Sequence, residues 1–291
     1  MPYRHEYCRA GRTKQHTYYY ATRTDTKEGS RRRKENKTSE AQKKVNSRQS
    51  VKKLTWILNE NFDSTSLYVT FSYEKDKRPS GKEELRAGVE KLLRDIRRIY
   101  RAAGEVAKYV WVAEVGERGA AHVHMVLNAI DVKSLRKCWN NGWITIKPLD
   151  DSGQYRRLAS YFVKYSEKTM KTCEGFSGRR YNSSKNLKIP QPQRTTVTAK
   201  NAYNHTIEIP RGWYLDKDSV AEAWHEVTGF MYFTYTLIYD GNADMRQKDT
   251  YTMNLETGEV TITEKPKKER RKSESKVQTD KDIRRASAAG G

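Results

Sequence analysis

The stretch AKYVWVAEVGERGAAHVHMVLNAI, residues 107–130, predicts two β-strands joined by a tight turn. β-Branched and aromatic residues dominate both halves, and GERG at 116–119 supplies the turn, so we expect a hairpin of strands 107–116 and 120–130. Side chains alternate between the two faces of a strand, so His122 and His124 share one face. The turn brings Glu114, in the first strand, opposite one of these histidines.

The elements on either side of this hairpin predict the fold class. SLYVTFSY (66–73) and WITIKPL (143–149) have strand composition, whereas 82–103 and 154–171 repeat apolar residues at helical spacing. This order predicts an α+β fold, an antiparallel sheet with helices packed on one face, of the split βαβ kind. We also expect a short strand within 3–25, a helix over 36–59 and strands after 229, and a loop over 172–212.

The charge of the chain points to a polyanionic partner. The formal net charge is +21, with basic runs at RRRKENK (31–37) and in the last 27 residues. Cys8, Cys138 and Cys173 are isolated, which predicts neither a disulfide framework nor a zinc finger. We find no signal peptide and no apolar run long enough to span a membrane, so we expect a soluble, cytoplasmic protein.

The histidine pair predicts a metal site. Two imidazoles and the Glu114 carboxylate, converging from adjacent strands, make a three-ligand site for a divalent cation with positions left for substrate and water. The simpler alternative is a pair of hydrogen-bonded histidines beside an ordinary glutamate. The remaining histidines are single residues that we expect to be structural or exposed: His5, His16, His205 and His225.

LASYFVKYSEK, residues 158–168, predicts a helix that carries candidate catalytic residues. Tyr161, Lys164, Tyr165 and Lys168 are three and four residues apart and therefore share one stripe. A phenol, with a pKa near ~10, is a weak nucleophile unless a cation stabilises its phenolate, which neighbouring lysines and a facing metal would do. Alternatively, the tyrosines belong to the apolar face of an amphipathic helix.

With these motifs the sequence resembles the HUH endonuclease superfamily, specifically the rolling-circle replication initiators (Rep proteins) of bacterial plasmids and phages. YVTFSY (68–73) resembles the first motif of the family, HVH (122–124) the second, and the overlapping YFVK (161–164) and YSEK (165–168) the third. Glu114 takes the place of the family's third metal ligand. The resemblance covers about residues 40–215, and GRRYNSSKNLKIP (178–190) resembles a segment that follows the tyrosine helix.

The resemblance implies an RRM-like HUH endonuclease core that nicks and rejoins single-stranded DNA at a replication origin. Mg²⁺ or Mn²⁺ would be held by Glu114, His122 and His124. Tyr161 would attack the phosphate to leave a 5′-phosphotyrosine and a free 3′-OH, with Tyr165 as a possible second nucleophile and Lys164, then Lys168, supporting the phosphate. Candidate DNA contacts are Arg179, Arg180, Lys185 and Lys188. No helicase P-loop is present, so a host helicase and DNA polymerase are expected partners, in the cytoplasm of a bacterial host.

On this basis the expected organisation is a basic N-terminal extension (1–60), an HUH endonuclease domain (61–215), a strand region (216–262) and a disordered basic tail (263–291). Three alternatives stay open. One is a non-catalytic single-stranded nucleic-acid-binding module, with aromatic platforms at Trp111, Trp139 and Trp143 unless these are core residues. Another is an oxygenase with two His and one carboxylate, which leaves the positive charge unexplained. A single-tyrosine HUH transposase or relaxase would share the chemistry.

Overall fold

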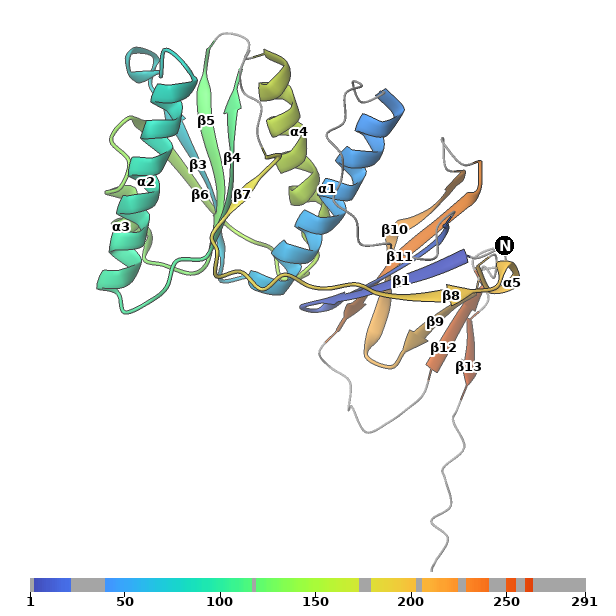
Figure 1. The fold of residues 1–291 in the computed structure, drawn as a ribbon. Coiled ribbons are helices and arrows are strands. Elements are labelled where there is room, and N and C mark those ends of the chain that lie inside the picture. Colours follow the sequence, from blue (N-terminus) through green and yellow to red (C-terminus); the bar gives the residue numbers. More distant parts are fainter. Residues whose placement is uncertain are drawn as a thin grey trace, which may run out of the picture.

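The computed structural model describes residues 3–21, 40–116, 119–172, 179–202, 206–224, 229–240, 250–254 and 260–263. They form two lobes, which meet along helix α1 (Glu40–Asn61) (Figure 1). The first, the α/β lobe, contains β3 (Leu67–Tyr73), a short 3-10 turn η1 (Lys75–Lys77), α2 (Lys82–Ala102), β4 (Tyr109–Val115), β5 (Ala121–Leu127), α3 (Val132–Arg136), β6 (Gly142–Pro148), α4 (Arg156–Thr172) and β7 (Asn182–Ser183). The second, the β lobe, contains β1 (Tyr3–Ala10), β2 (Thr13–Tyr20), β8 (Gln193–Val197), α5 (Ala199–Ala202), β9 (Thr206–Pro210), β10 (Trp213–Trp224), β11 (Met231–Tyr239), β12 (Thr250–Asn254) and β13 (Val260–Thr263).

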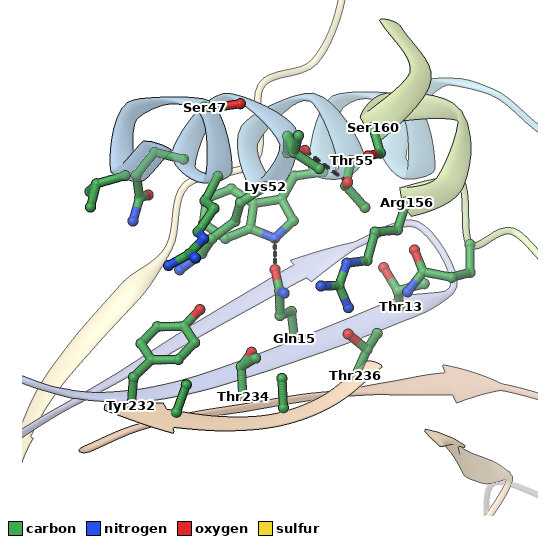
Figure 2. Close-up of a pocket in the computed structure, with 18 of the residues that line it drawn as sticks. Thr13, Gln15, Ser47, Lys52, Thr55, Arg156, Ser160, Tyr232, Thr234 and Thr236 are labelled. Carbon is green, nitrogen blue, oxygen red and sulfur yellow. Dashed lines mark hydrogen bonds between the residues drawn. The ribbon is translucent and has the colours of Figure 1, made fainter. Parts of the chain in front are cut away.

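The two lobes are joined through α1. Trp56 of this helix packs against Cys8 and Ala10 of β1, and its indole Nε1 donates to Gln15 Oε1 of β2 at 2.6 Å (Figure 2). The turn between β1 and β2 lies so close to the end of α1 that a Cβ at Gly11 would stand 2.0 Å from the carbonyl oxygen of Asn59. Gly11 also has a φ of 53°, which favours glycine. The same helix packs against α4 of the α/β lobe, so it belongs to both lobes.

The α/β lobe has the predicted split βαβ arrangement. Its sheet has the order β6-β3-β5-β4-β7, and each neighbouring pair is antiparallel. β3 and β4, connected through α2, lie on either side of β5, which separates them as a split βαβ unit requires. The predicted α+β class with an antiparallel sheet is confirmed. Helices cover both faces of this sheet, with α2 and α3 on one side and α1 and α4 on the other (Figure 1).

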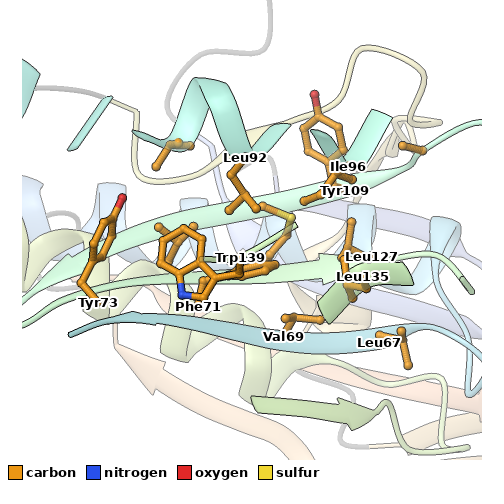
Figure 3. Packing of buried hydrophobic residues seen from close by; sticks show 14 of the residues in the cluster. Leu67, Val69, Phe71, Tyr73, Leu92, Ile96, Tyr109, Leu127, Leu135 and Trp139 are labelled. Atoms are coloured by element: carbon orange, nitrogen blue, oxygen red, sulfur yellow. The ribbon is translucent and has the colours of Figure 1, made fainter. Parts of the chain in front are cut away.

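Successive side chains of β3 point to opposite faces of the sheet, so one face is apolar and the other is polar. Val69 and Phe71 are fully buried in the apolar cluster beneath α2, where the Phe71 ring lies 5.3 Å from that of Trp139 (Figure 3). The residues between them, Tyr68, Thr70 and Ser72, point to the opposite face, toward α1 and α4. A hydrophobic face thus fixes the sheet, and the polar face is available for chemistry.

The β lobe combines strands from distant parts of the chain. β2 pairs with β11 and β1 pairs with β8, so the sheet order is β10-β11-β2-β1-β8, and a second sheet has the order β13-β12-β9. The prediction of a loop over 172–212 was wrong, because β7, β8, α5 and β9 lie there. β8 is mostly exposed and is ordered by hydrogen bonds to β1, so its sequence carries no apolar periodicity.

Several predictions fall on residues outside the described ranges. These are the basic run 31–37, residues 117 and 118 of the hairpin turn, His205, His225, and the tail from residue 264 onward. The division of the chain at residues 60, 215 and 262 stays a prediction. Within the described part of the chain, none of the helices combines the length and the apolar character that crossing a membrane requires.

A half-buried histidine, His16, predicts how the stability of the β lobe depends on pH. His16 is stacked on Tyr235 and bonded to His5 at 3.0 Å, and burial, with the charges of His5 and Lys14, lowers its pKa to about 3. Between that value and 6.5 the unfolded chain binds more protons, so the free energy of unfolding falls as the pH falls, by at most about 1.4 kcal/mol per pH unit. Urea denaturation at several pH values checks this. The variant His16→Gln should show a shallower dependence, and an unchanged slope would contradict the assignment.

Candidate active site

The polar face of the α/β sheet brings the predicted ligands together. In the register of the sheet, Glu114 of β4 lies opposite His122 of β5, and Thr70 and Ser72 of β3 lie opposite His124 and His122. All five side chains therefore project to the face that α1 and α4 cover. The hairpin predicted from the sequence is present, with its two histidines on one side.

His124 is held by contacts on both ring nitrogens. Its Nε2 lies 3.0 Å from Glu114 Oε2, and its Nδ1 lies 3.0 Å from the Tyr68 hydroxyl and 3.2 Å from Thr70 Oγ1. The residue is only 6% exposed, and this burial lowers the pKa of the imidazole against the opposing effect of Glu114. The ring therefore stays neutral at physiological pH, which is the form that binds metals.

His122 stands beside this pair without joining it. Its Nδ1 lies 2.9 Å from Ser72 Oγ, and its ring centroid is 6.1 Å from that of His124. Among the described residues no group of three or more His, Cys, Asp and Glu side chains is close enough to hold a metal ion as it stands. The closest association within the predicted ligand set is the hydrogen-bonded pair of Glu114 and His124.

Helix α4 lies across these residues and carries the two tyrosines. The Tyr165 ring is stacked on the His124 imidazole, with centroids 4.4 Å apart and an interplanar angle of 10°. Burial, followed by the charge of Glu114, raises the pKa of Tyr165. Tyr161, one turn earlier, is 55% exposed, and its ring centroid is 6.2 Å from that of Tyr165. One tyrosine thus touches the histidine, and the other faces outward next to it.

The lysines of α4 differ in their surroundings. Lys168 Nζ lies 3.3 Å from Glu114 Oε1, so the Glu114 carboxylate joins a histidine of the sheet to a lysine of the helix. Lys164 is exposed. Thr169 fixes the helix to the sheet, because its Oγ1 accepts from the Val115 amide and donates to the Ala113 carbonyl, both at 3.1 Å. The end of α4 is therefore locked to β4, beside Glu114.

The donor set suits a divalent cation. Two imidazoles and one carboxylate are common ligands of Zn²⁺, Mn²⁺ and Fe²⁺, and the carboxylate is also a ligand for Mg²⁺. The hydroxyls of Tyr68, Thr70 and Ser72 each contact an imidazole Nδ1, as the outer partners of ligating histidines do. Nε2 of His124 is directed at Glu114, and a cation placed there would replace the hydrogen bond between them.

The predicted DNA contacts fall into two groups. Arg180 lies beside α4, with Nε 2.9 Å from Glu167 Oε1, and Arg179 next to it is exposed. Lys185 and Lys188 are also exposed, but they follow β7, which pairs with the first residues of β4, at the far end of that strand from Glu114. The structure therefore brings only Arg179 and Arg180 toward the tyrosine helix.

The tryptophans proposed as stacking platforms have different roles. Trp139 is 6% exposed and donates from Nε1 to the Ser72 carbonyl, so it is a core residue. Trp111 is partly buried against the same core. Trp143 is 65% exposed on β6, an edge strand. A platform formed by the three together is absent.

The side chains of the candidate site, from Tyr68 of β3 to Thr169 of α4, come from one continuous segment of the chain. Residues 66–170 match the family model of Replication-associated protein ORF2/G2P. This replication-associated segment comprises strands β3, β4, β5 and β6 of the split βαβ sheet and nearly all of α4, and the match supports a role in replication. No curated protein and no solved structure matches the chain.

Some residues of the replication-associated segment were not predicted individually. Tyr68, Thr70 and Ser72 lie within the first motif, but their role as hydrogen-bond partners of the histidines was not foreseen. The sequence does contain a signal for this role. Polar residues at every second position of an otherwise apolar strand indicate a face that does not pack in the hydrophobic core. Thr169 gives no such signal in the sequence.

Proposed function

We propose that this chain initiates replication by cutting one strand of DNA through a tyrosine of α4. The observation that carries the proposal is the stacking of Tyr165 on His124, which is bonded to Glu114, itself paired with Lys168. A phenol, a carboxylate, an imidazole and an ammonium group thus converge on one sheet face within the replication-associated segment. The net charge of +21 suits a nucleic-acid substrate.

In the proposed reaction a phenolic oxygen of α4 attacks the phosphorus of a backbone phosphodiester. The oxygen–phosphorus bond to tyrosine forms as the bond to the 3′ oxygen breaks, which leaves a 5′-phosphotyrosine and a free 3′-OH. The phenol proton passes to solvent, and the departing 3′ oxygen takes up a proton. Lys168 and Lys164 place positive charge beside the phosphate. The free 3′-OH would then prime synthesis by a DNA polymerase.

The proposal includes a divalent cation, Mg²⁺ or Mn²⁺, held by Glu114, His122 and His124. When bound, such an ion would polarise a phosphodiester as a Lewis acid and would offset the charge of Glu114, which acts together with the larger effect of burial to raise the pKa of Tyr165. The protein's own contribution is to orient the two imidazoles, His124 through Tyr68 and His122 through Ser72.

The two tyrosines suit a cycle of cutting and rejoining. Tyr161 and Tyr165 are one helical turn apart, with ring centroids at 6.2 Å, so one can hold the DNA while the other attacks. The sequence ranks Tyr161 first, whereas Tyr165 makes the contact with His124. The proposed partners are single-stranded origin DNA and, because the sequence contains no P-loop motif, a helicase and a polymerase of a bacterial host.

The test is to capture the covalent intermediate. The protein is incubated with labelled single-stranded fragments that tile the replicon carrying its gene, with Mn²⁺ or Mg²⁺, and the products are separated on a denaturing gel. We expect a labelled protein–DNA adduct from one fragment, lost when EDTA is present. Failure to form an adduct with any fragment and any divalent ion would contradict the proposal and favour a binding module.

A further inference from the structure

A cavity of about 470 Å³ lies between the two lobes, away from the histidines. Its walls are α1, the N-terminal part of α4, and strands β2, β10 and β11 (Figure 2). The volume falls within the range of ligand-binding pockets, roughly 300–1,000 Å³. Most of its lining lies outside the replication-associated segment, because only Gln154, Arg156 and Ser160 belong to residues 66–170.

The charge of the lining selects an anion. Arg48, Lys52 and Arg156 line the cavity, and the lining contains no Asp or Glu. Lys52 is already paired with Glu6, behind the cavity wall. The guanidinium of Arg156 makes no hydrogen bond or ion pair with any residue that the structure describes, and it points into the cavity (Figure 2). A guanidinium in this setting is a binding group for phosphate.

The sheet that faces the cavity is polar on that side. β2 presents Thr13 and Gln15, and β11 presents Thr234 and Thr236, whereas the alternate residues of β11 fill the apolar cluster on the other face. Hydroxyl and amide groups in a recess suit the hydrogen-bonding edges of a base or a sugar–phosphate backbone. Two of these groups also hold α1 to β2, since Gln15 Oε1 accepts from Trp56 and Thr13 Oγ1 accepts from Asn59.

Aromatic side chains complete the cavity. Trp224 at the end of β10 is 69% exposed and is among the residues that line the recess, and Tyr232 of β11, which lies opposite Ala223 in the β10–β11 register, lines it too. Exposed aromatic rings next to a basic recess are the combination by which single-stranded DNA is bound, with bases stacked and phosphates neutralised. We propose that this cavity binds a nucleotide of single-stranded DNA, its phosphate on Arg156 and its base against Trp224 or Tyr232.

The position of the cavity relates it to the tyrosines. Arg156 and Ser160 lie on the flank of α4 that faces α1, and Tyr161, at the next position, points to the outer side of the helix. From Arg156 to Tyr161 the helix rises by about 7.5 Å. DNA held in the cavity would pass over the first turns of α4 before it reaches Tyr161 and Lys164. The cavity thus provides a second grip on the strand, separate from the place of cutting.

The test measures binding without the covalent step, so that its outcome does not depend on the proposed cutting reaction. The full chain carrying Tyr161→Phe and Tyr165→Phe is titrated, in EDTA, into a fluorescein-labelled oligo(dT) of about 12 nucleotides, within the usual site size of single-strand-binding modules. Anisotropy gives the affinity. We expect Arg156→Gln to weaken binding about tenfold and to reduce the slope of log K against log salt by about 0.7. Trp224→Ala should also weaken binding about tenfold, and Trp224→Phe should retain most of it.

Two matched variants control for charge and for aromatic content. Arg157→Gln removes the same charge at the next position, where the side chain is paired with Asp218 and does not line the cavity. Tyr214→Ala removes an exposed ring from the same strand, β10, outside the cavity. Both should stay within about twofold of the parent. Equal losses in control and cavity variants would overturn the proposal. So would displacement of the oligonucleotide by dTMP at comparable concentration, or equal binding of oligo(U), because the site would then serve a free nucleotide or RNA.

Discussion

Replacing Tyr161 and Tyr165 together with phenylalanine abolishes the covalent adduct with single-stranded DNA. Loss of a catalytic nucleophile commonly costs a thousandfold or more, so the rate should fall by at least about 10³. The fold should be kept, because Phe preserves the rings that stack on His124 and on each other and removes only the hydroxyl groups. The denaturing gel that detects the adduct measures the effect.

The single variants decide which hydroxyl attacks. If Tyr165→Phe removes the adduct and Tyr161→Phe retains it, the contact with His124 identifies the nucleophile; the opposite result supports the ranking made from the sequence. If each single variant retains part of the activity, the two tyrosines act in turn. Tyr214→Phe, an exposed tyrosine of the β lobe, is the control and should be fully active. An adduct that survives the double variant would exclude both residues.

Glu114→Ala is expected to reduce adduct formation by about 100-fold or more. Glu114 is the one carboxylate that contacts both His124, at 3.0 Å, and Lys168, at 3.3 Å, among the residues described. Removing this side chain takes an anionic ligand away from the proposed cation site. It also removes the carboxylate that lies between the His124 imidazole and the Lys168 ammonium group. Calorimetric titration with Mn²⁺ should show weaker binding in the variant, which separates a loss of cation affinity from a loss of fold.

The matched control for this variant is Glu90→Ala. Glu90 lies on α2, on the other side of the sheet, where it pairs with Arg86 at 3.0 Å. This change should leave adduct formation and Mn²⁺ binding within about twofold of the wild-type values. If Glu114→Ala retains full activity, the carboxylate is a structural partner of His124 and the proposed three-ligand site is wrong.

Local patterns predicted the α/β lobe well. Helix α2 repeats Leu85, Val89, Leu92 and Ile96 on one buried face, and the boundaries of β4 and β5 follow their β-branched residues. These elements are neighbours in sequence as well as in space, so periodicity, turn residues and length carry nearly all of the information. The split βαβ order could be deduced for the same reason.

The β lobe could not be predicted in this way. Its main sheet pairs β1 with β8, which comes fewer than 200 residues later, and β2 with β11, which comes more than 200 residues later, and no local pattern encodes such pairings. β10 contains Asp216, Lys217 and Asp218, and its register with β11 is interrupted at that point, so its sequence does not alternate as a regular strand does. The cavity between the lobes was hidden as a result, since its walls come from five separate elements.

Sequence patterns predicted which residues of the candidate site share a face, but not how α4 is rotated about its axis. Alternation on β5 placed His122 and His124 on one face, and helical spacing placed Tyr161 and Tyr165 on one stripe. Which tyrosine meets the histidine depends on how the helix is rotated about its axis. Contacts such as that of Thr169 with β4 fix this rotation, and they exist only in three dimensions.

Because α1 is built into both lobes at once, the recess beneath it and the hydroxyls of α4 are parts of one rigid frame. A DNA strand bound in this recess would present a phosphate at a fixed position to the hydroxyls of α4. If the chain cuts DNA as proposed, it would select the scission point by the length of DNA between an anchored base and the attacking tyrosine. Lengthening or shortening the spacer between the two contacted nucleotides would shift the cut by the same number of bases.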